Sequence, residues 1–295
     1  MGKALYDAFP EARATFEEAD EALGEKFSTL CFEGPADTLT LTANAQPAIV
    51  TTSIAALRVI RAQVPNTPLP AFAAGHSLGE YSALVAAGAL AFADAVRLVR
   101  LRGKAMQEAV PPGVGAMAAI LGGEEPDVRA LCDAAREGDV LSPANFNAPG
   151  QIVIAGSAAA VERARALASD RKLKAIPLQV SAPFHCRLMQ PAASVVAQAL
   201  STTTISALQF PVVSNFEARP NQDSARVAEL LVRQVDGAVL WEPSVRLMIQ
   251  SGVSRALEIG PGAVLAGLTR KIDKSVPVLS VSTPETVAQV AAFLG

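Results

Sequence analysis

Short apolar runs alternate along most of this chain with longer segments whose apolar residues recur at helical spacing. Strands that alternate with helices are typical of parallel sheets, so the pattern predicts an α/β fold with a largely parallel sheet. The 295 residues are 51% hydrophobic, which is ample for a large buried core. Outside the middle of the chain, the predicted strands are 71–74, 210–214, 254–259 and 276–281. The predicted helices are 3–23 (bent near Pro10), 47–63 (with Pro47 in its first turn), 94–109, 187–200, 223–235, 242–251, 262–271 and one from Pro284.

The middle of the chain has a different order of elements. Strands are predicted at 115–121, 139–146, 151–155 and 173–180, with helices at 125–137 and 158–169. The order β-α-β-β-α-β is that of the split βαβ, or ferredoxin-like, arrangement. We therefore expect a large α/β catalytic domain made of residues 1–112 and 182–295, with a ferredoxin-like subdomain of residues 113–181 inserted into it.

The segment Gly75-His76-Ser77-Leu78-Gly79 matches the G-x-S-x-G pattern of a nucleophile elbow. An apolar strand is predicted before it and a helix rich in small residues after it, as in an α/β-hydrolase-like core. We expect the glycines on both sides of Ser77 to permit a close approach of neighbouring backbone. The serine would then stand at a helix N-terminus, where the N–H of Leu78 is positioned to hold an oxyanion. The alternative is a Gly-Ser turn in which Ser77 only caps the helix.

A serine nucleophile needs a general base, and the chain has two histidines. His76 is adjacent to Ser77, so its side chain should diverge from the serine and pack structurally. His185, in a loop after the last strand of the predicted insertion, is the remaining candidate. Asp223 and Asp236 follow it, but nothing around either marks an orienting acid. A backbone carbonyl could orient the imidazole instead, which would make a Ser–His dyad.

Two further residues have side chains suited to chemistry. Arg102 shares a helix face with Leu98 and Met106 at i, i+4 spacing, so it projects from a partly apolar stripe. An arginine there can pair with a carboxylate, either of a dicarboxylic acyl group or of a structural ion pair. Cys186 is a rival nucleophile, but it lacks a glycine elbow and free cysteines are usually buried.

Composition excludes several classes of function. The net charge is −3, with no long run of either sign, and 5% of residues are aromatic, so nucleic-acid binding is not expected. No apolar stretch is long enough for a membrane helix, and the N-terminus does not resemble a secretory signal. Three scattered cysteines indicate neither a disulfide framework nor a metal site. We expect a protein of the cytoplasm.

Six segments carry a resemblance to a known family. They are 75–84 (GHSLGEYSAL), 102–107 (RGKAMQ), 145–156 (NFNAPGQIVIAG), 181–186 (SAPFHC) with 211–215 (PVVSN), and 258–268 (EIGPGAVLAGL). In the same order, they resemble the malonyl-CoA:acyl carrier protein transacylases of bacterial fatty-acid synthesis. The resemblance spans nearly the whole chain.

The resemblance implies a transfer in two steps. Ser77, assisted by His185, would take a malonyl group from malonyl-CoA, and the phosphopantetheine thiol of acyl carrier protein would then accept it, with no further cofactor. Arg102 resembles the arginine that pairs with the malonyl carboxylate. Gln234 stands where the family has a glutamine whose main-chain carbonyl orients the histidine. Phe184 and Asn145 would contribute to substrate binding.

The N-terminus departs from the family pattern. Members begin with an apolar strand ending in Gly-Gln-Gly-Ser-Gln, whose glutamine supplies a second oxyanion N–H, whereas residues 1–5 here resemble the helix that follows that loop. We expect that the start was assigned at an internal methionine. A chain that truly lacked this donor would lose about 10²–10³ in turnover. The mass of the native protein distinguishes the two.

Other functions remain open at this point. A malonyltransferase acting in trans in polyketide synthesis would carry the same residues. A serine esterase or thioesterase would share the elbow but would not need Arg102, and a catalytically impaired paralogue is consistent with the N-terminal departure.

Overall fold

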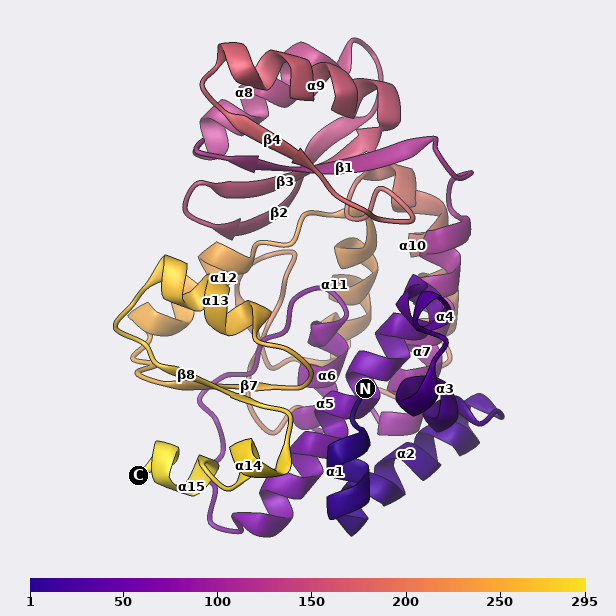
Figure 1. Cartoon of the computed structure of the whole chain (residues 1–295), viewed down its shortest axis with the longest axis vertical. Helices are drawn as coiled ribbons and strands as arrows, with labels where there is room; N and C mark the ends of the chain where they lie inside the picture. The colour runs from indigo at the N-terminus through magenta and orange to yellow at the C-terminus, as the bar shows by residue number, and fades with distance from the viewer.

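The computed structural model describes all of residues 1–295 and has two parts, a helix-covered sheet and a larger helix-rich body (Figure 1). The helices are α1 Lys3–Ala8, α2 Pro10–Leu23, α3 Phe27–Glu33, α4 Ala36–Thr40, α5 Thr42–Gln63, α6 Gly79–Ala86, α7 Phe92–Glu108, α8 Glu125–Arg136, α9 Ala158–Asp170, the 3-10 helix η1 Arg187–Met189, α10 Gln190–Leu200, α11 Ser224–Asp236, α12 Trp241–Gln250, α13 Val264–Ile272, α14 Pro284–Val287 and α15 Val290–Leu294. The strands are β1 Gly115–Leu121, β2 Leu141–Ala148, β3 Gln151–Ser157, β4 Lys174–Pro177, β5 Val212–Val213, β6 Pro220–Asn221, β7 Ala256–Ile259 and β8 Val278–Val281.

The smaller part is a four-stranded antiparallel sheet in the order β2-β3-β1-β4, with α8 and α9 packed on one face (Figure 1). Its apolar core lies between that face and the two helices and includes Ile120, Leu131 and Ile154, all fully buried. The elements follow the predicted β-α-β-β-α-β order along the chain. The division of the chain into a catalytic domain and an inserted subdomain remains a prediction.

The larger part confirms the α/β class, but its strand pairing is short. β7 and β8 form a parallel pair, β5 and β6 an antiparallel one, and the predicted strand 71–74 contributes only a parallel bridge between Ala73 and Val212. Helices α5, α6, α7, α10 and α11 surround a core of 27 buried residues in this part. From the bridge at Ala73, the chain therefore runs through the elbow into the packed helical core.

Two features of the N-terminal region were not predicted. Helices α3 and α4 occupy residues for which the pattern indicated no element. Helix α5 begins at Thr42, so Pro47 lies inside the helix and not in its first turn. This start lies where α5 crosses α7 closely, since a Cβ at Gly103 of α7 would lie 2.5 Å from the Thr42 carbonyl oxygen. The close crossing brings Gln46 of α5 against Arg102 of α7.

The two parts of the fold meet beside the end of α11. The Phe146 N–H donates to the Val239 carbonyl, and the Val239 N–H donates to the Ala144 carbonyl, so β2 pairs with the segment that follows α11. This pairing holds the C-terminal end of α11, which carries Gln234, against the sheet of the smaller part. No helix combines the length and apolar character that crossing a membrane requires.

Candidate active site

Ser77 lies in a sharp turn directly before α6, with a φ of 52°. Positive φ is unusual for a residue other than glycine and marks a constrained position. A Cβ at Gly75 would lie 2.0 Å from the Gly79 carbonyl oxygen, so the turn closes only with glycine at 75. A Cβ at Gly79 would meet nothing within 4 Å. The expectation that both glycines permit a close approach is therefore wrong for Gly79, since the backbone contact falls on one side of the serine.

Asn215 holds the backbone that leads into the nucleophile. Its Oδ1 accepts the Ser77 N–H at 2.6 Å, and its Nδ2 donates to the Gly75 carbonyl at 2.7 Å. The side chain is 1% exposed, so water does not compete for these bonds. Sequence reasoning missed this residue. The available signal was a polar side chain placed directly after the predicted strand 210–214.

Ser77 and His185 form the predicted dyad geometry. The Ser77 Oγ lies 2.8 Å from His185 Nε2, and His185 Nδ1 lies 2.9 Å from the Gln234 carbonyl oxygen. Because a carbonyl can only accept, Nδ1 carries the proton and Nε2 is free to accept one from the serine. Burial, reinforced by the nearby Arg102 charge, lowers the pKa of His185 to about 3. The imidazole is therefore neutral at pH 7 and ready to act as a base.

Arg102 is buried to 1% exposure beside the dyad, and every acceptor it has is neutral. Its Nη1 donates to Gln46 Oε1 at 2.7 Å, and its Nη2 donates to Gln234 Oε1 at 2.8 Å and to Ser77 Oγ at 3.0 Å. The Nε atom is buried without a partner. Burial lowers the pKa of this guanidinium, although an arginine stays charged at neutral pH. No carboxylate lies within ion-pair distance, so the alternative of a structural ion pair is excluded.

The other predicted residues lie around this centre in different ways. The Leu78 N–H, next to Ser77, makes no hydrogen bond and is free to donate. Phe184 is half-buried beside His185, where two apolar clusters meet. Asn145 lies in β2, and its buried side chain bonds to none of the three central residues. The structure therefore brings Leu78 and Phe184 to the dyad but does not join Asn145 to it.

His76 points away from Ser77, as expected. Its Nε2 lies 2.9 Å from Asn147 Oδ1 in the smaller part, and its ring packs against Trp241 at 5.8 Å between centroids. Burial lowers its pKa. His76 therefore connects the elbow to the sheet of the smaller part.

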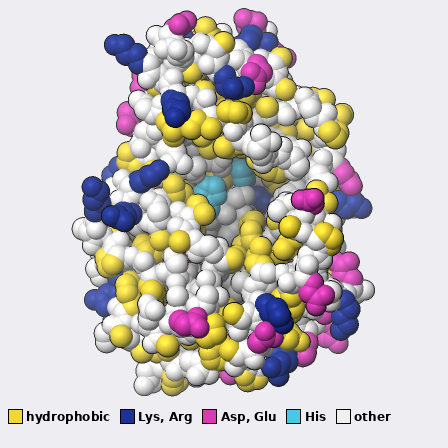
Figure 2. Space-filling view, in the orientation of Figure 1, with side chains coloured by type: hydrophobic (Ala, Val, Ile, Leu, Met, Phe, Trp, Pro, Cys, Tyr) yellow, Lys and Arg dark blue, Asp and Glu magenta, His cyan; other side chains and the backbone are white.

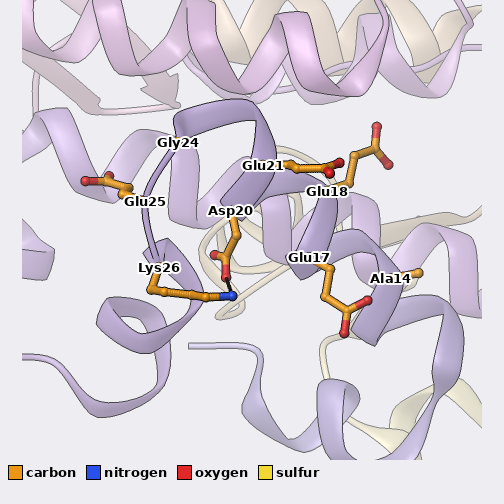
Figure 3. A pocket seen from close by; sticks show the side chains of 8 residues that line it. All are labelled: Ala14, Glu17, Glu18, Asp20, Glu21, Gly24, Glu25 and Lys26. Atoms are coloured by element: carbon orange, nitrogen blue, oxygen red, sulfur yellow. Dashed lines mark ion pairs between the residues drawn. The ribbon is translucent and has the colours of Figure 1, made fainter.

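The surface is hollowed between the two parts, and histidine side-chain atoms are visible in this hollow (Figure 2). The dyad is therefore within reach of a substrate entering from that face. A separate cavity of about 650 Å³ lies on α2 and the α2–α3 connection (Figure 3). It is lined mainly by carboxylates and contains none of the predicted site residues. No group of histidines, cysteines and carboxylates in the structure is arranged to hold a metal ion.

Comparison with known proteins identifies the family. The acyl transferase domain family matches residues 1–291 of the chain. The chain belongs to the acyl transferase family. It is 49% identical over 289 residues to the malonyl CoA-acyl carrier protein transacylase of Bacillus subtilis, covering 97% of this chain and 90% of that protein. It is 47% identical over 282 residues to the protein of the same name in Escherichia coli, covering 95% and 91% of the two chains.

Solved structures show the same relationship for this acyl transferase. An acyl-carrier-protein-S-malonyltransferase from Bartonella henselae superposes with a TM-score of 0.96 at 46% identity, covering 100% of this chain and 95% of the other. A second match is to a structure of a type II polyketide-synthase acyl carrier protein in complex with its malonyl-transacylase. It has a TM-score of 0.95 at 42% identity, covering 99% of this chain and 94% of the matched chain. The α/β fold of the acyl transferase is thus shared with solved members of the family.

The acyl transferase site contains a carboxylate that sequence reasoning missed. Glu80 lies one helical turn beyond Ser77 and is 3% exposed. It is not the acid of a triad, because His185 bonds to the Gln234 carbonyl instead. Asp223, one of the acids considered from the sequence, instead caps α11 by accepting the Ala225 N–H at 2.9 Å. The sequence carried a signal for Glu80, because it is a charged residue in an otherwise mainly apolar helix directly after the elbow.

Proposed function

We propose that this acyl transferase moves a malonyl group from malonyl-CoA to the phosphopantetheine thiol of acyl carrier protein, as an acyl-carrier-protein S-malonyltransferase of fatty-acid synthesis. One observation carries the proposal: Arg102 is buried without a counter-ion and donates to the nucleophilic oxygen itself, 3.0 Å away. A buried guanidinium next to the reacting atom selects an acyl group with a terminal carboxylate. The names of the relatives, malonyl transacylases at up to 49% identity, agree with this substrate.

The first half-reaction acylates the enzyme. Ser77 Oγ attacks the thioester carbonyl while His185 Nε2 takes its proton, and the Leu78 N–H donates to the oxyanion that forms. The Gln234 carbonyl keeps the proton on Nδ1 of the imidazole and so keeps Nε2 available. The tetrahedral intermediate then expels the CoA sulfur, which takes the proton from His185. The products are a malonyl-serine ester and free CoA.

The second half-reaction repeats these steps with a different nucleophile. The phosphopantetheine thiol gives its proton to His185 and attacks the ester, and Ser77 Oγ leaves with that proton. Malonyl-carrier protein and free enzyme result, so the cycle needs no cofactor beyond the CoA thioester substrate. We place the reaction in the cytoplasm, in keeping with three cysteines that are all free. We assign the dyad to residues 1–112 and 182–295, and the wall of the hollow opposite it to residues 113–181.

The test measures transfer of radioactive malonyl and acetyl groups from CoA to holo-acyl carrier protein. Each charge-assisted hydrogen bond to the malonyl carboxylate contributes about 1.5–3 kcal/mol. Loss of a bidentate pair, about 3–6 kcal/mol, in Arg102→Ala should therefore lower kcat/KM for malonyl-CoA by about 10²–10⁴-fold. The ratio of malonyl to acetyl transfer should fall by a similar factor, because acetyl lacks the carboxylate.

Arg97→Ala is the matched control, since Arg97 lies on the same helix but is exposed and paired with Asp94. It should leave both rates unchanged. Release of free malonate in place of transfer would indicate a thioesterase. A wild-type protein that transfers acetyl as fast as malonyl would contradict the proposal. Comparing the carrier proteins of fatty-acid and polyketide synthesis as acceptors in the same assay assigns the pathway.

A further inference from the structure

Glu80 is buried at the centre of the site without a cation to pair with. Its side chain is 3% exposed, and no lysine or arginine lies within ion-pair distance. Burial raises its pKa to about 7, although the Gln234 and Asn215 bonds and the Arg102 charge oppose this. A buried carboxylate that lacks a counter-ion is costly unless hydrogen bonds satisfy it. The hydrogen bonds of Glu80 must therefore account for its burial.

A single oxygen of Glu80 accepts two hydrogen bonds from distant parts of the chain. Oε2 accepts the Asn215 N–H at 3.1 Å and the Gln234 Nε2–H at 2.8 Å. The first donor belongs to the residue whose side chain holds the Gly75 carbonyl and the Ser77 N–H. The second belongs to the residue whose carbonyl orients His185.

The Gln234 side chain carries the connection further. Its Nε2 also donates to the Ser77 carbonyl at 2.9 Å, and its Oε1 accepts from Arg102 at 2.8 Å. Nucleophile, base and guanidinium are thus all connected through Gln234, while Glu80 fixes Gln234 relative to Asn215. Without an acceptor at this point, the amide of Gln234 in α11 would lose one of the three hydrogen bonds that hold it, the one to the Glu80 side chain of α6.

We propose that Glu80 is a positioning residue, whose Oε2 holds Asn215 and Gln234 in register and thereby aligns Ser77 with His185. The inference rests on the proposed acyl transfer for its role in turnover, but the alignment itself is a property of the dyad. What matters is an acceptor oxygen at this place. The negative charge is not required, because both donors are neutral amides.

Both hydrogen bonds of Glu80 go to Oε2, and a small cavity lies beside the residue. A cavity of about 10 Å³ lies against Glu80, Ser214 and Asn221, which is close to the space of one water molecule. The Ser214 hydroxyl is buried there without a hydrogen-bond partner. Glu80→Gln can therefore keep an acceptor oxygen toward Asn215 and Gln234 and direct its new NH₂ group to this cavity. Glu80→Asp keeps the charge but withdraws the carboxylate by about 1.5 Å.

The experiment compares Glu80→Gln, Glu80→Asp and Glu80→Ala in the full chain by two readouts. One is the rate at which a fluorophosphonate labels Ser77, which requires an aligned dyad but no malonyl-CoA. The other is kcat and KM for malonyl transfer. A misplacement of about 1 Å can cost about 10²-fold in rate. We expect losses of that size in labelling and kcat for Glu80→Asp and Glu80→Ala, with KM little changed, and rates close to wild type for Glu80→Gln.

Asp20→Ala is the control for a general loss of stability. Asp20 of α2 accepts the N–H and hydroxyl of Ser28 in α3 at 2.7 and 2.8 Å, so its removal also breaks a two-donor carboxylate site. It should lower the melting temperature without changing the labelling rate.

Two outcomes overturn the proposal. They are unchanged labelling in Glu80→Asp and Glu80→Ala, or a defect in Glu80→Gln as large as in Glu80→Asp. If Glu80→Ala does not fold, the Gln and Asp variants still decide. A wild-type protein that is labelled rapidly but transfers no malonyl would refute the proposed function and leave the positioning role testable by labelling alone.

Discussion

Replacing Gly75 by alanine tests whether close packing of the elbow places the nucleophile. The added Cβ would lie 2.0 Å from the Gly79 carbonyl oxygen, 2.1 Å from its carbon and 2.7 Å from the Glu80 nitrogen. These are backbone atoms at the start of α6, so no side-chain rotation relieves the overlap. A tolerable carbon–oxygen contact is about 3.3 Å. The turn and the helix must therefore separate by more than about 1 Å.

A separation of that size has two measurable consequences. Overpacking commonly costs about 1–3 kcal/mol of stability, and we expect the upper part of this range because the helix N-terminus must move as a unit. Misplacement of Ser77 by about 1 Å should lower its reactivity by about 10²-fold. Denaturant titration measures the first effect, and the rate of fluorophosphonate labelling measures the second.

Gly79→Ala is the matched control within the same motif. Its Cβ would meet nothing within 4 Å, and residue 79 begins a helix, where alanine is favoured over glycine by up to about 1 kcal/mol. The variant should be as stable as wild type or more stable. If Gly75→Ala kept normal stability and labelling, or if Gly79→Ala were equally damaged, the reasoning from close approach would be refuted.

Two pH dependences also follow from the site. Because the pKa of His185 is lowered to about 3, acylation of Ser77 should stay nearly constant from pH 7 to about pH 5. A histidine with the ordinary pKa of 6.5 would lose about 25-fold over this range, so a loss of that size in a pH–rate profile would contradict the assignment. The pKa of Glu80 is raised from 4.5 to about 7, so its contribution to stability is complete below pH 4.5 and is lost as pH rises through 7. The loss amounts to about 3 kcal/mol and should be absent in Glu80→Gln when free energies of unfolding are compared across this range.

Much of the fold was predictable because its signals are local. Helical spacing marked α2, α7 and α11, and the β-α-β-β-α-β order marked the smaller part before any contact was known. The short parallel pairing of the larger part was not predictable, since apolar runs such as 71–74 indicate burial but not how many ladder bonds form. The start of α5 at Thr42 was missed because Pro47 suits a first turn, and the close crossing with α7 at Thr42 is a tertiary contact that no local signal marks.

Part of the site was predictable, because a serine elbow requires a base and few residues of the chain could supply it. By itself, the sequence determined the elbow at Ser77, left His185 as the remaining base and placed Arg102 on a partly apolar helix face, because turn chemistry and helical periodicity act over a few residues. Only the tertiary structure decided which polar groups meet. The Ser77–His185 contact joins residues separated by 108 positions, and the Gln234–Glu80 contact joins residues separated by 154. Hydrogen-bond partners at such separations depend on how distant elements converge, and that convergence gives the dyad a carbonyl in place of an acid, a guanidinium without a counter-ion and a buried carboxylate between them.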